Sequence, residues 1–214
     1  MKLKKILTLM CCAVLLVCIS VGATVAYLTS QDTVVNTFTV GNVQITLDET
    51  DVDPYGKQDG TTRVDANTYK LMPGHTYTKD PIVHVQSGSE ECYVRAQVTV
   101  SDIAKLKAAF PVKDYPTFYN GDVFLLQMLV GGWDNTKWEF KTVNGGMYEF
   151  WYTAKVDARI QAVDLPAIFS TITIPGTADA TAIANLNNVT VNVVAHAIQA
   201  DGFADATAAW AAWN

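Results

Sequence analysis

The stretch Glu91–Ser101, ECYVRAQVTVS, alternates apolar with polar or amphipathic side chains along its whole length. Successive side chains of a β-strand point to opposite faces, so this pattern predicts a strand with one face in the core. The expected core residues are Cys92, Val94, Ala96, Val98 and Val100, and the opposite face carries Tyr93, Arg95, Gln97 and Thr99. The phase of Cys92 predicts a buried structural thiol, because a catalytic thiol needs a histidine partner and an electropositive setting.

Other short strands are expected on both sides of this one. Val83 and Val85 share a face after Asp80-Pro81, and Asn144-Gly145-Gly146 is a strong hairpin signal between two further arms. The other expected strands are Phe38–Leu47 with a bend at Gly41, Tyr69–Met72 before a Pro-Gly turn, Ile168–Ile174, and Val189–Gln199 as a central strand. The expected loop is Glu49–Asn67, and the expected helices are a short one capped by Ser101, Thr177–Leu186, and the tail from Asp201 with Trp210 and Trp213 packed on the sheet. Together these elements indicate an all-β fold, a jelly-roll-like β-sandwich with short helices as lids.

The stretch Thr24–Asp48, TVAYLTSQDTVVNTFTVGNVQITLD, joins an N-terminal targeting segment to the first expected strand. Three lysines lie within the first five residues, and no charged residue follows them before residue 29. A basic start, an apolar run and small residues at Thr24 and Ala26 predict a secretory signal peptide, residues 1–26, cut before Tyr27. The alternative is a segment retained as an anchor, because about 20 apolar residues can span a bilayer.

The charge balance limits the partners that the chain can have. The 214 residues include 15 basic and 21 acidic side chains, a formal net charge of −6. Loss of the three N-terminal lysines leaves 12 basic and 21 acidic side chains, a net charge of −9. An acidic surface disfavours nucleic acid as a partner. Cys92 is the one cysteine beyond residue 26, so no intrachain disulfide can form in the secreted chain.

No motif in the chain names a reaction. HExxH, GxSxG, a P-loop and a dinucleotide fingerprint are all absent from the sequence. His75, His84 and Glu90 form the best candidate metal-binding set, with ordinary strand or loop histidines as the alternative. Asp51–Gly56 resembles the start of a calcium loop without the bidentate glutamate of an EF-hand, which leaves a weaker calcium site or a solvated loop. We therefore expect no catalytic, cofactor-binding or metal-binding residue and no enzymatic activity.

Several segments resemble the TasA/camelysin family of exported Gram-positive proteins. They are Gly22–Ala26 followed by Tyr-Leu-Thr-Ser, Asn36–Val43 (NTFTVGNV), Leu71–His75, Thr78–Pro81, Glu90–Val100, and Ile198–Phe203 with the Ala/Trp helix after it. The resemblance covers most of the chain, and Asn-Thr-Phe-Thr-Val-Gly after an atypical cleavage site is its specific part. It implies a jelly-roll domain, secretion to the extracellular matrix or cell surface, and processing by a dedicated signal peptidase, usually called SipW.

The resemblance also implies a mode of assembly. In TasA-like fibres of the biofilm matrix, the N-terminal strand of one subunit completes the sheet of the next. Carried over, this divides the chain into a signal peptide (1–26) and a single domain (27–214) that begins with a donor-strand segment (27–47). The expected cleavage residues are Thr24, Ala26 and Tyr27, and the expected assembly-strand residues are Phe38, Val40, Val43, Ile45 and Leu47. Head-to-tail strand addition does not close on itself, so it yields a filament of identical copies, with an accessory matrix protein as a further expected partner.

Two other functions remain as alternatives. One is a cell-surface binding module or adhesin with an aromatic groove around Tyr119, Trp133 and Trp138. The other is a metallopeptidase, because some members of the family carry that description, although this sequence has no metal-ligand motif to match it.

Overall fold

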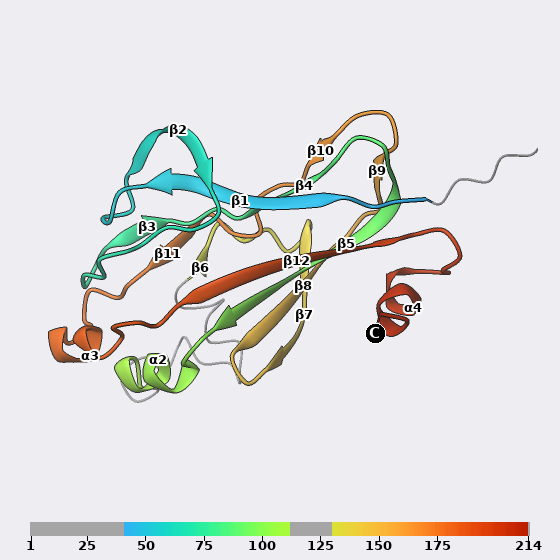
Figure 1. Ribbon diagram of the computed structural model, residues 1–214. Coiled ribbons are helices and arrows are strands. Elements are labelled where there is room, and N and C mark those ends of the chain that lie inside the picture. Colours follow the sequence, from blue (N-terminus) through green and yellow to red (C-terminus); the bar gives the residue numbers. More distant parts are fainter. Residues whose placement is uncertain (1–40, 112–129, 214) are drawn as a thin grey trace, which may run out of the picture. The chain divides into compact units, whose positions relative to one another are not determined.

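The computed structural model describes residues 41–111 and 130–213 (Figure 1). The chain divides into two units after Val40, and all described residues belong to the second unit. The strands are β1 (Ile45–Val52), β2 (Gln58–Val64), β3 (Thr76–Thr78), β4 (Ile82–Val85), β5 (Ser89–Val100), β6 (Val130–Gly131), β7 (Trp138–Asn144), β8 (Met147–Tyr152), β9 (Val156–Ala158), β10 (Val163–Asp164), β11 (Thr171–Thr173) and β12 (Val191–Gln199). The helices are α2 (Ile103–Ala109), α3 (Ala180–Ala184) and α4 (Ala206–Ala211). None of these helices is long and apolar enough to cross a membrane.

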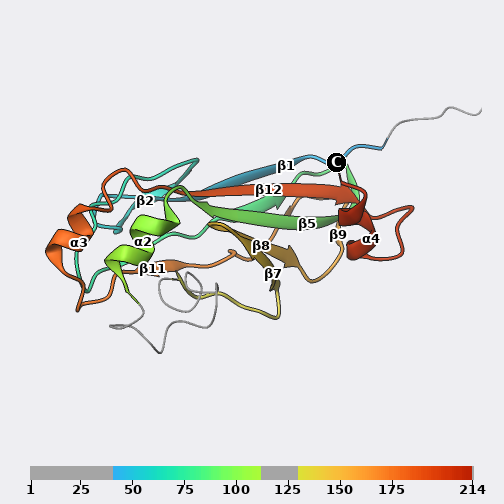
Figure 2. The same ribbon diagram turned by 90° about the horizontal axis from the view of Figure 1, so that it is seen from below.

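The longest described strand, β5, lies inside the antiparallel sheet β12-β5-β8-β7, and β9 pairs with its N-terminal end (Figure 2). All five residues predicted for its inner face are buried, and Cys92 and Val94 have no exposed surface. The strand and its inward phase are therefore confirmed. Burial also raises the pKa of the Cys92 thiol to about 11, with the Glu91 charge as a smaller cause, so the thiol is held in its protonated form.

The hairpin β7–β8 forms as its turn sequence predicts. Asn144 pairs with Met147 across the turn, and Gly145 has a φ of 62°. Glycine reaches this left-handed backbone conformation without the steric cost that a Cβ atom brings, which is why Gly145-Gly146 favours this two-residue turn.

A second layer consists of the sheet β10-β4-β1-β2 and the smaller sheet β3-β11-β6. Val83 and Val85 of β4 belong to the same hydrophobic core as Val94 of β5 and Phe150 of β8. Two layers of antiparallel sheet therefore share one core, which is the sandwich-like, all-β arrangement expected from the sequence.

The outer face of β5 is covered by α4. Tyr93, predicted on the polar face, is only 7 % exposed because it packs with Trp210 and Ala209 in a second apolar cluster. The Arg95 guanidinium lies 4.5 Å from the centroid of the Trp210 ring, a cation–π contact. The predicted packing of the tail is thus confirmed for Trp210, whereas Trp213 remains 40 % exposed.

The predicted loop Glu49–Asn67 is wrong. β1 continues to Val52, and β2 pairs with it in an antiparallel hairpin, with Glu49 opposite Val64. The polar composition of β2 reflects exposure rather than irregular backbone, because its first five residues are all exposed. Gly56 closes the connection with a φ of 75°, at a point where a Cβ atom would lie 2.7 Å from the Cα of Tyr77.

The strand β12 is at the edge of its sheet and not at its centre, so that prediction is also wrong. Its side chains are apolar on both faces for two different reasons. Val191, Val193, Ala195 and Ala197 pack against the main core, and Ile198 packs against the cluster under α4.

Smaller differences concern where elements begin. β1 starts at Ile45, the segment Tyr69–Met72 is not a strand, and only Thr171–Thr173 of the predicted Ile168–Ile174 strand forms a ladder. The cap of α2 is Asp102 rather than Ser101, because the Asp102 side chain accepts from the Lys105 amide and the Ser101 hydroxyl accepts from the Thr190 amide.

Candidate assembly site between β1 and β12

The outer edge of β12 has no strand partner among residues 41–111 and 130–213. Ser101 N donates to Thr190 O, and Ala200 N donates to Glu91 O, at the two ends of the β5–β12 ladder. Main-chain hydrogen bonds alternate along an antiparallel pair, so the even-numbered residues of β12 direct their N–H and C=O groups toward β5. The odd-numbered residues, from Val191 to Gln199, direct theirs away from it.

The edge of β1 that faces β12 is also unpaired over its first half. Gln86 N donates to Gln44 O, and Ile45–Asp48 pairs with β4, so the even-numbered residues here face β4. The main-chain groups of Ile45 and Leu47 face the other way, and β2 occupies that side only from Glu49 onward. β1 and β12 run side by side in both views, with Cα atoms approaching within 8 Å but with no ladder between them. We call this boundary the β1–β12 seam.

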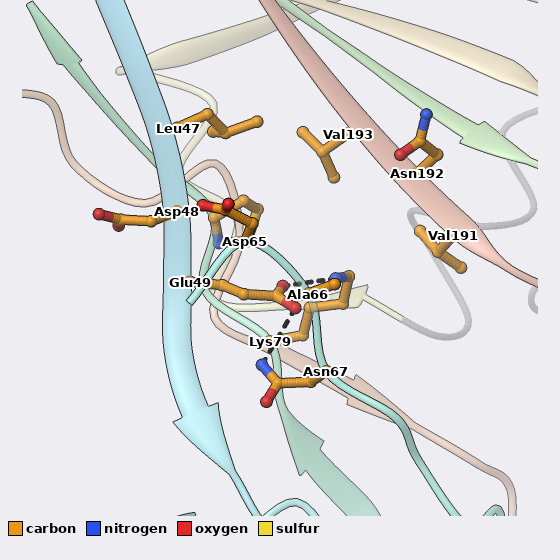
Figure 3. A pocket seen from close by; sticks show the side chains of 11 residues that line it. Leu47, Asp48, Glu49, Asp65, Ala66, Asn67, Lys79, Val191, Asn192 and Val193 are labelled. Atoms are coloured by element: carbon orange, nitrogen blue, oxygen red, sulfur yellow. Dashed lines mark hydrogen bonds and ion pairs between the residues drawn. The ribbon is translucent and has the colours of Figure 1, made fainter. Parts of the chain in front are cut away.

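A cavity of about 100 Å³ lies in the seam (Figure 3). Leu47 of β1 and Val193 of β12 line it from opposite sides. A larger cavity of about 1140 Å³ shares Asn67, Lys79 and Val191 with it. Its apolar lining comes from Tyr69, Leu71, Tyr77, Ile172, Ile174 and Leu186. The seam therefore combines unpaired main-chain groups with an apolar hollow.

The inner face of β1 carries a buried charged network next to the seam. Glu49 and Lys79 are 5 % and 7 % exposed, and Lys79 Nζ lies 2.5 Å from Glu49 Oε2. Asn67 Nδ2 donates to Glu49 Oε1 at 3.0 Å and to Thr50 O at 2.8 Å. Burial and the nearby Glu49 carboxylate raise the pKa of Tyr69. This part of the sandwich is therefore both charged and shielded from water.

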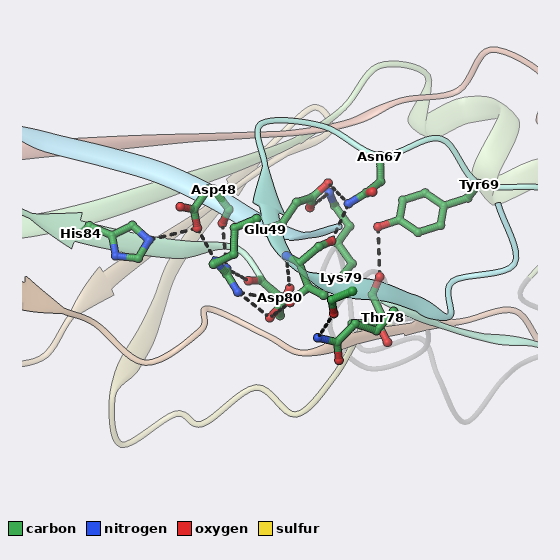
Figure 4. A network of polar contacts seen from close by, with 12 residues as sticks. Asp48, Glu49, Asn67, Tyr69, Thr78, Lys79, Asp80 and His84 are labelled. Carbon is green, nitrogen blue, oxygen red and sulfur yellow. Dashed lines mark hydrogen bonds and ion pairs between the residues drawn. The ribbon is translucent and has the colours of Figure 1, made fainter. Parts of the chain in front are cut away.

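The outer face of the same strand carries a second network (Figure 4). Arg63 Nε donates to Asp48 Oδ1 at 2.5 Å, and Arg63 Nη1 donates to Asp80 Oδ2 at 3.1 Å. The ring of His84 bridges two carboxylates, with Nδ1 2.7 Å from Asp164 Oδ1 and Nε2 3.0 Å from Asp48 Oδ1. This network links β1, β2, β4 and β10 across the sheet.

The carboxylates decide the charge of His84. Burial by itself would lower the pKa of His84, but the hydrogen bonds and charges of Asp164 and Asp48 outweigh burial and raise it. In the same way, burial would raise the pKa of Asp48, but Arg63 and His84 outweigh burial and lower it. The fold therefore favours the protonated form of His84 and the ionised form of Asp48, which are in contact between β4 and β1.

The predicted assembly residues fall into two groups. Ile45 and Leu47 lie in β1, where they are half-buried and paired with β4 of the same chain, and half-buried Val43 precedes the strand. Phe38 and Val40 lie outside the described residues, as do the predicted cleavage residues Thr24, Ala26 and Tyr27.

The other candidates do not gather into a site. Both ring nitrogens of His84 contact carboxylates, and His75 Nε2 contacts Tyr55 O, so the set with Glu90 does not form. No group of three His, Cys, Asp or Glu residues in the described ranges is arranged to hold a metal ion. The Asp53 carboxylate accepts from the amides of Tyr55 and Lys57 and so shapes a turn.

The aromatic groove that the adhesin alternative requires is not formed by the tryptophans. Trp138 has no exposed surface and donates from Nε1 to Pro166 O. Trp133 donates to Trp138 O and packs edge-on against Phe150, with ring centroids 5.9 Å apart. Tyr119 lies outside the described residues.

Glu49 and Asn67 were missed because Glu49–Asn67 was predicted to be a polar loop, and Lys79, which lies outside that loop, was not singled out. A signal for two of them is present in the sequence. Glu49 continues the inward phase of Ile45 and Leu47, and Lys79 continues the inward phase of Tyr77 and Val83. A charged side chain that points into the core needs a partner of opposite charge. The positions of Glu49 and Lys79 therefore each predict such a partner, but they do not identify which residue it is.

No family model matches the chain, and neither a curated protein nor a solved structure matches it. The resemblance to the TasA/camelysin family therefore rests on the quoted motifs alone and stays a prediction.

Proposed function

We propose that the chain is a secreted structural protein that assembles into extracellular biofilm fibres by donating an N-terminal strand from one copy to the next. The proposal combines the TasA/camelysin-like motifs around Asn36–Val43 with the unpaired edges in the described domain. A dedicated signal peptidase would expose the donor segment by cutting before Tyr27.

The observation that carries the proposal is the free outer edge of β12. Four odd-numbered residues of this strand, Val191 to Ala197, combine outward main-chain groups with side chains on the core. An unpaired edge of this length is a template for strand addition, since main-chain hydrogen bonds supply affinity and pockets for alternate side chains supply specificity. The apolar cavity beside Val191 provides such a pocket.

The seam must widen to accept a strand between β1 and β12. Neighbouring strands lie about 4.8 Å apart, so an inserted strand needs its two flanking strands about 9.6 Å apart. The Cα atoms of β1 and β12 approach within 8 Å. A movement of at least about 1.6 Å, or addition at the end of β12 that borders the larger cavity, would satisfy the spacing.

The proposed donor residues are those before β1, including Phe38 and Val40. Ile45 and Leu47 are paired with β4 of their own chain, so they anchor the donor segment to the subunit that provides it. Removing this part of β1 from β4 would cost the ladder hydrogen bonds of its even-numbered residues and the core contacts of Ile45 and Leu47, which favours donation of the upstream residues alone.

Electron microscopy of the secreted protein tests the proposal, after its N-terminus has been sequenced. The chain that starts at Tyr27 should form thin filaments, and deletion of Tyr27–Asn36 should leave a folded monomer. Phe38→Ser with Val40→Ser keeps the length and should also prevent filaments, whereas Thr29→Ser with Thr33→Ser is the matched control and should not. Unchanged filaments from the deletion variant would refute strand donation.

A further inference from the structure

An amine, a carboxamide and a carboxylate meet on the inner face of β1. The Glu49 carboxylate holds one nitrogen on each oxygen, with Lys79 Nζ at 2.5 Å from Oε2 and Asn67 Nδ2 at 3.0 Å from Oε1. The three side chains come from β1, from the segment after β2 and from the residue that follows β3. Figure 3 shows both contacts converging on Glu49.

The burial of the Glu49–Lys79 pair is costly if its role is only to stabilise the fold. Lys79 is 7 % and Glu49 5 % exposed, beside the apolar side chains of Leu47 and Val193. Transfer of two charges out of water commonly offsets their mutual attraction, so an apolar pair of similar volume often serves stability equally well. The residue types therefore point to chemistry between these groups.

The environment of Asn67 activates its carboxamide for attack. Val52 N donates to Asn67 Oδ1 at 3.0 Å, which polarises the carbonyl and would stabilise the negative charge that develops on this oxygen. Nδ2, the leaving nitrogen, is held by Glu49 Oε1 and by Thr50 O. The cavity of about 100 Å³ beside the trio gives a departing ammonia molecule room, because a water molecule occupies about 30 Å³ in the liquid.

We propose that Lys79 and Asn67 form an intramolecular isopeptide bond, with Glu49 as the proton carrier. Glu49 takes a proton from the Lys79 ammonium, and the freed lone pair of Nζ attacks Cγ of Asn67. The Nζ–Cγ bond forms, the Cγ–Nδ2 bond breaks, and Glu49 delivers the proton to Nδ2. That one proton converts Nδ2 into ammonia, which departs, and the second proton that Nζ loses passes to the Glu49 carboxylate, so no oxidant or other reactant is consumed. Proximity in a buried site supplies the rate that the same groups lack in water.

The cross-link closes a ring through residues 67–79, which contains β3 and whose two ends, Asn67 and Lys79, line the cavity in the β1–β12 seam. Closing a ring removes conformational freedom from the unfolded chain, as a disulfide does. The chain beyond residue 26 has Cys92 as its one cysteine, so a disulfide cannot perform this role. If the protein is secreted as proposed, an isopeptide bond would stabilise its fold covalently, and reducing agents would not cleave that bond.

Mass spectrometry of the full chain tests the cross-link directly. After the N-terminus is established, the intact mass should be lower than the sequence mass by one ammonia molecule. A protease digest should contain one branched peptide that joins the Asn67 segment to the Lys79 segment. The digest is essential because Asn120-Gly121 and Asn144-Gly145 can each lose ammonia by succinimide formation, and tandem spectra distinguish a succinimide from the branched peptide.

Variants separate the three roles. Lys79→Arg should restore the full sequence mass, and Glu49→Gln should keep both reacting groups but slow cross-linking by at least about tenfold, since a positioned proton carrier contributes about 10²–10⁴-fold. Asn67→Asp should still cross-link, with loss of water in place of ammonia. The matched controls are Lys70→Arg and Asn192→Ala, both of exposed residues near the same cavities, which should leave the branched peptide unchanged.

The time course keeps the test independent of variant folding. Protein held in denaturant from cell lysis onward and then refolded should gain the branched peptide only after refolding. Recovery of linear, unmodified Asn67 and Lys79 peptides from natively folded protein after prolonged incubation overturns the proposal. Cross-linking of Glu49→Gln at the wild-type rate overturns the role of Glu49.

Discussion

Replacing Ala195 by proline removes one outward-facing N–H group from β12 and should weaken assembly while leaving the fold intact. Ala195 lies opposite Ala96 in the β5–β12 ladder, at a position whose main-chain groups point into the seam. Proline at an edge position of this kind costs no ladder hydrogen bond, and the preceding residue is already extended, as a residue before proline prefers. We expect the free energy of unfolding to change by less than about 1 kcal/mol.

The neighbouring variant Val194→Pro is the matched control for the fold. Val194 pairs with Gln97 and directs its N–H group toward β5, so proline there deprives the Gln97 carbonyl of its donor. Loss of this hydrogen bond should lower the free energy of unfolding by about 1–3 kcal/mol. The Val194 side chain is 42 % exposed and contributes little packing, so the difference between the two variants reports main-chain direction.

Urea denaturation and filament assembly are then measured on both variants. For Ala195→Pro the critical concentration for filaments should rise at least about tenfold, because loss of one hydrogen bond and close approach of the donated strand costs about 1.4 kcal/mol or more. Filaments from a stably folded Ala195→Pro protein at the wild-type critical concentration would show that the β12 edge is not the acceptor.

Three further predictions concern groups whose environment the structure defines. Cys92 in the native protein should react with a thiol reagent only at the rate of unfolding, because it is buried and its pKa is raised to about 11; rapid stoichiometric labelling would contradict this. His84→Asn should destabilise the protein by about 1 kcal/mol at pH 5. The pKa of His84 is raised by the fold, so this contribution is complete below the unfolded value of about 6.5 and is lost as pH rises through the folded value; a difference from wild type that instead grows above pH 7 in urea titrations would refute the sign. Trp210→Ala should lower the free energy of unfolding by about 3 kcal/mol because the ring is only 6 % exposed, whereas Trp213→Ala should lower it by less than about 1 kcal/mol. Equal losses for the two variants in denaturant unfolding would argue against the packing of α4 on β5.

Local patterns predicted several elements correctly. The alternation from Cys92 to Val100 predicted β5 and its buried face, because a strand in contact with a core repeats its environment every two residues. The Asn-Gly-Gly turn predicted the β7–β8 hairpin, because the needed backbone conformation is a local property of those residues. The prediction from composition was wrong at β2. The first five residues of this strand are exposed, so its sequence lacks the apolar alternation that identifies a strand.

The candidate sites depended on information that side-chain periodicity does not contain. The phase of Glu49 and Lys79 could indicate two buried charges, but they are 30 positions apart, and only folding brings Glu49, Lys79 and Asn67 together. The sequence of β12 likewise indicates only which of its side chains are shielded from water. An edge strand with both faces covered has the same alternation of side chains as a central strand, so the sequence could not distinguish the two positions.

By itself, then, the sequence determined the all-β class, the buried thiol, the acidic surface and the hairpin, because each follows from local periodicity, turn chemistry or composition. Only the tertiary structure decided that β12 is an edge, that its free main-chain groups face β1, and that an amine and a carboxamide share one buried carboxylate. Those features depend on which strands pair across the chain, and main-chain pairing between distant segments leaves no periodic mark on either of them.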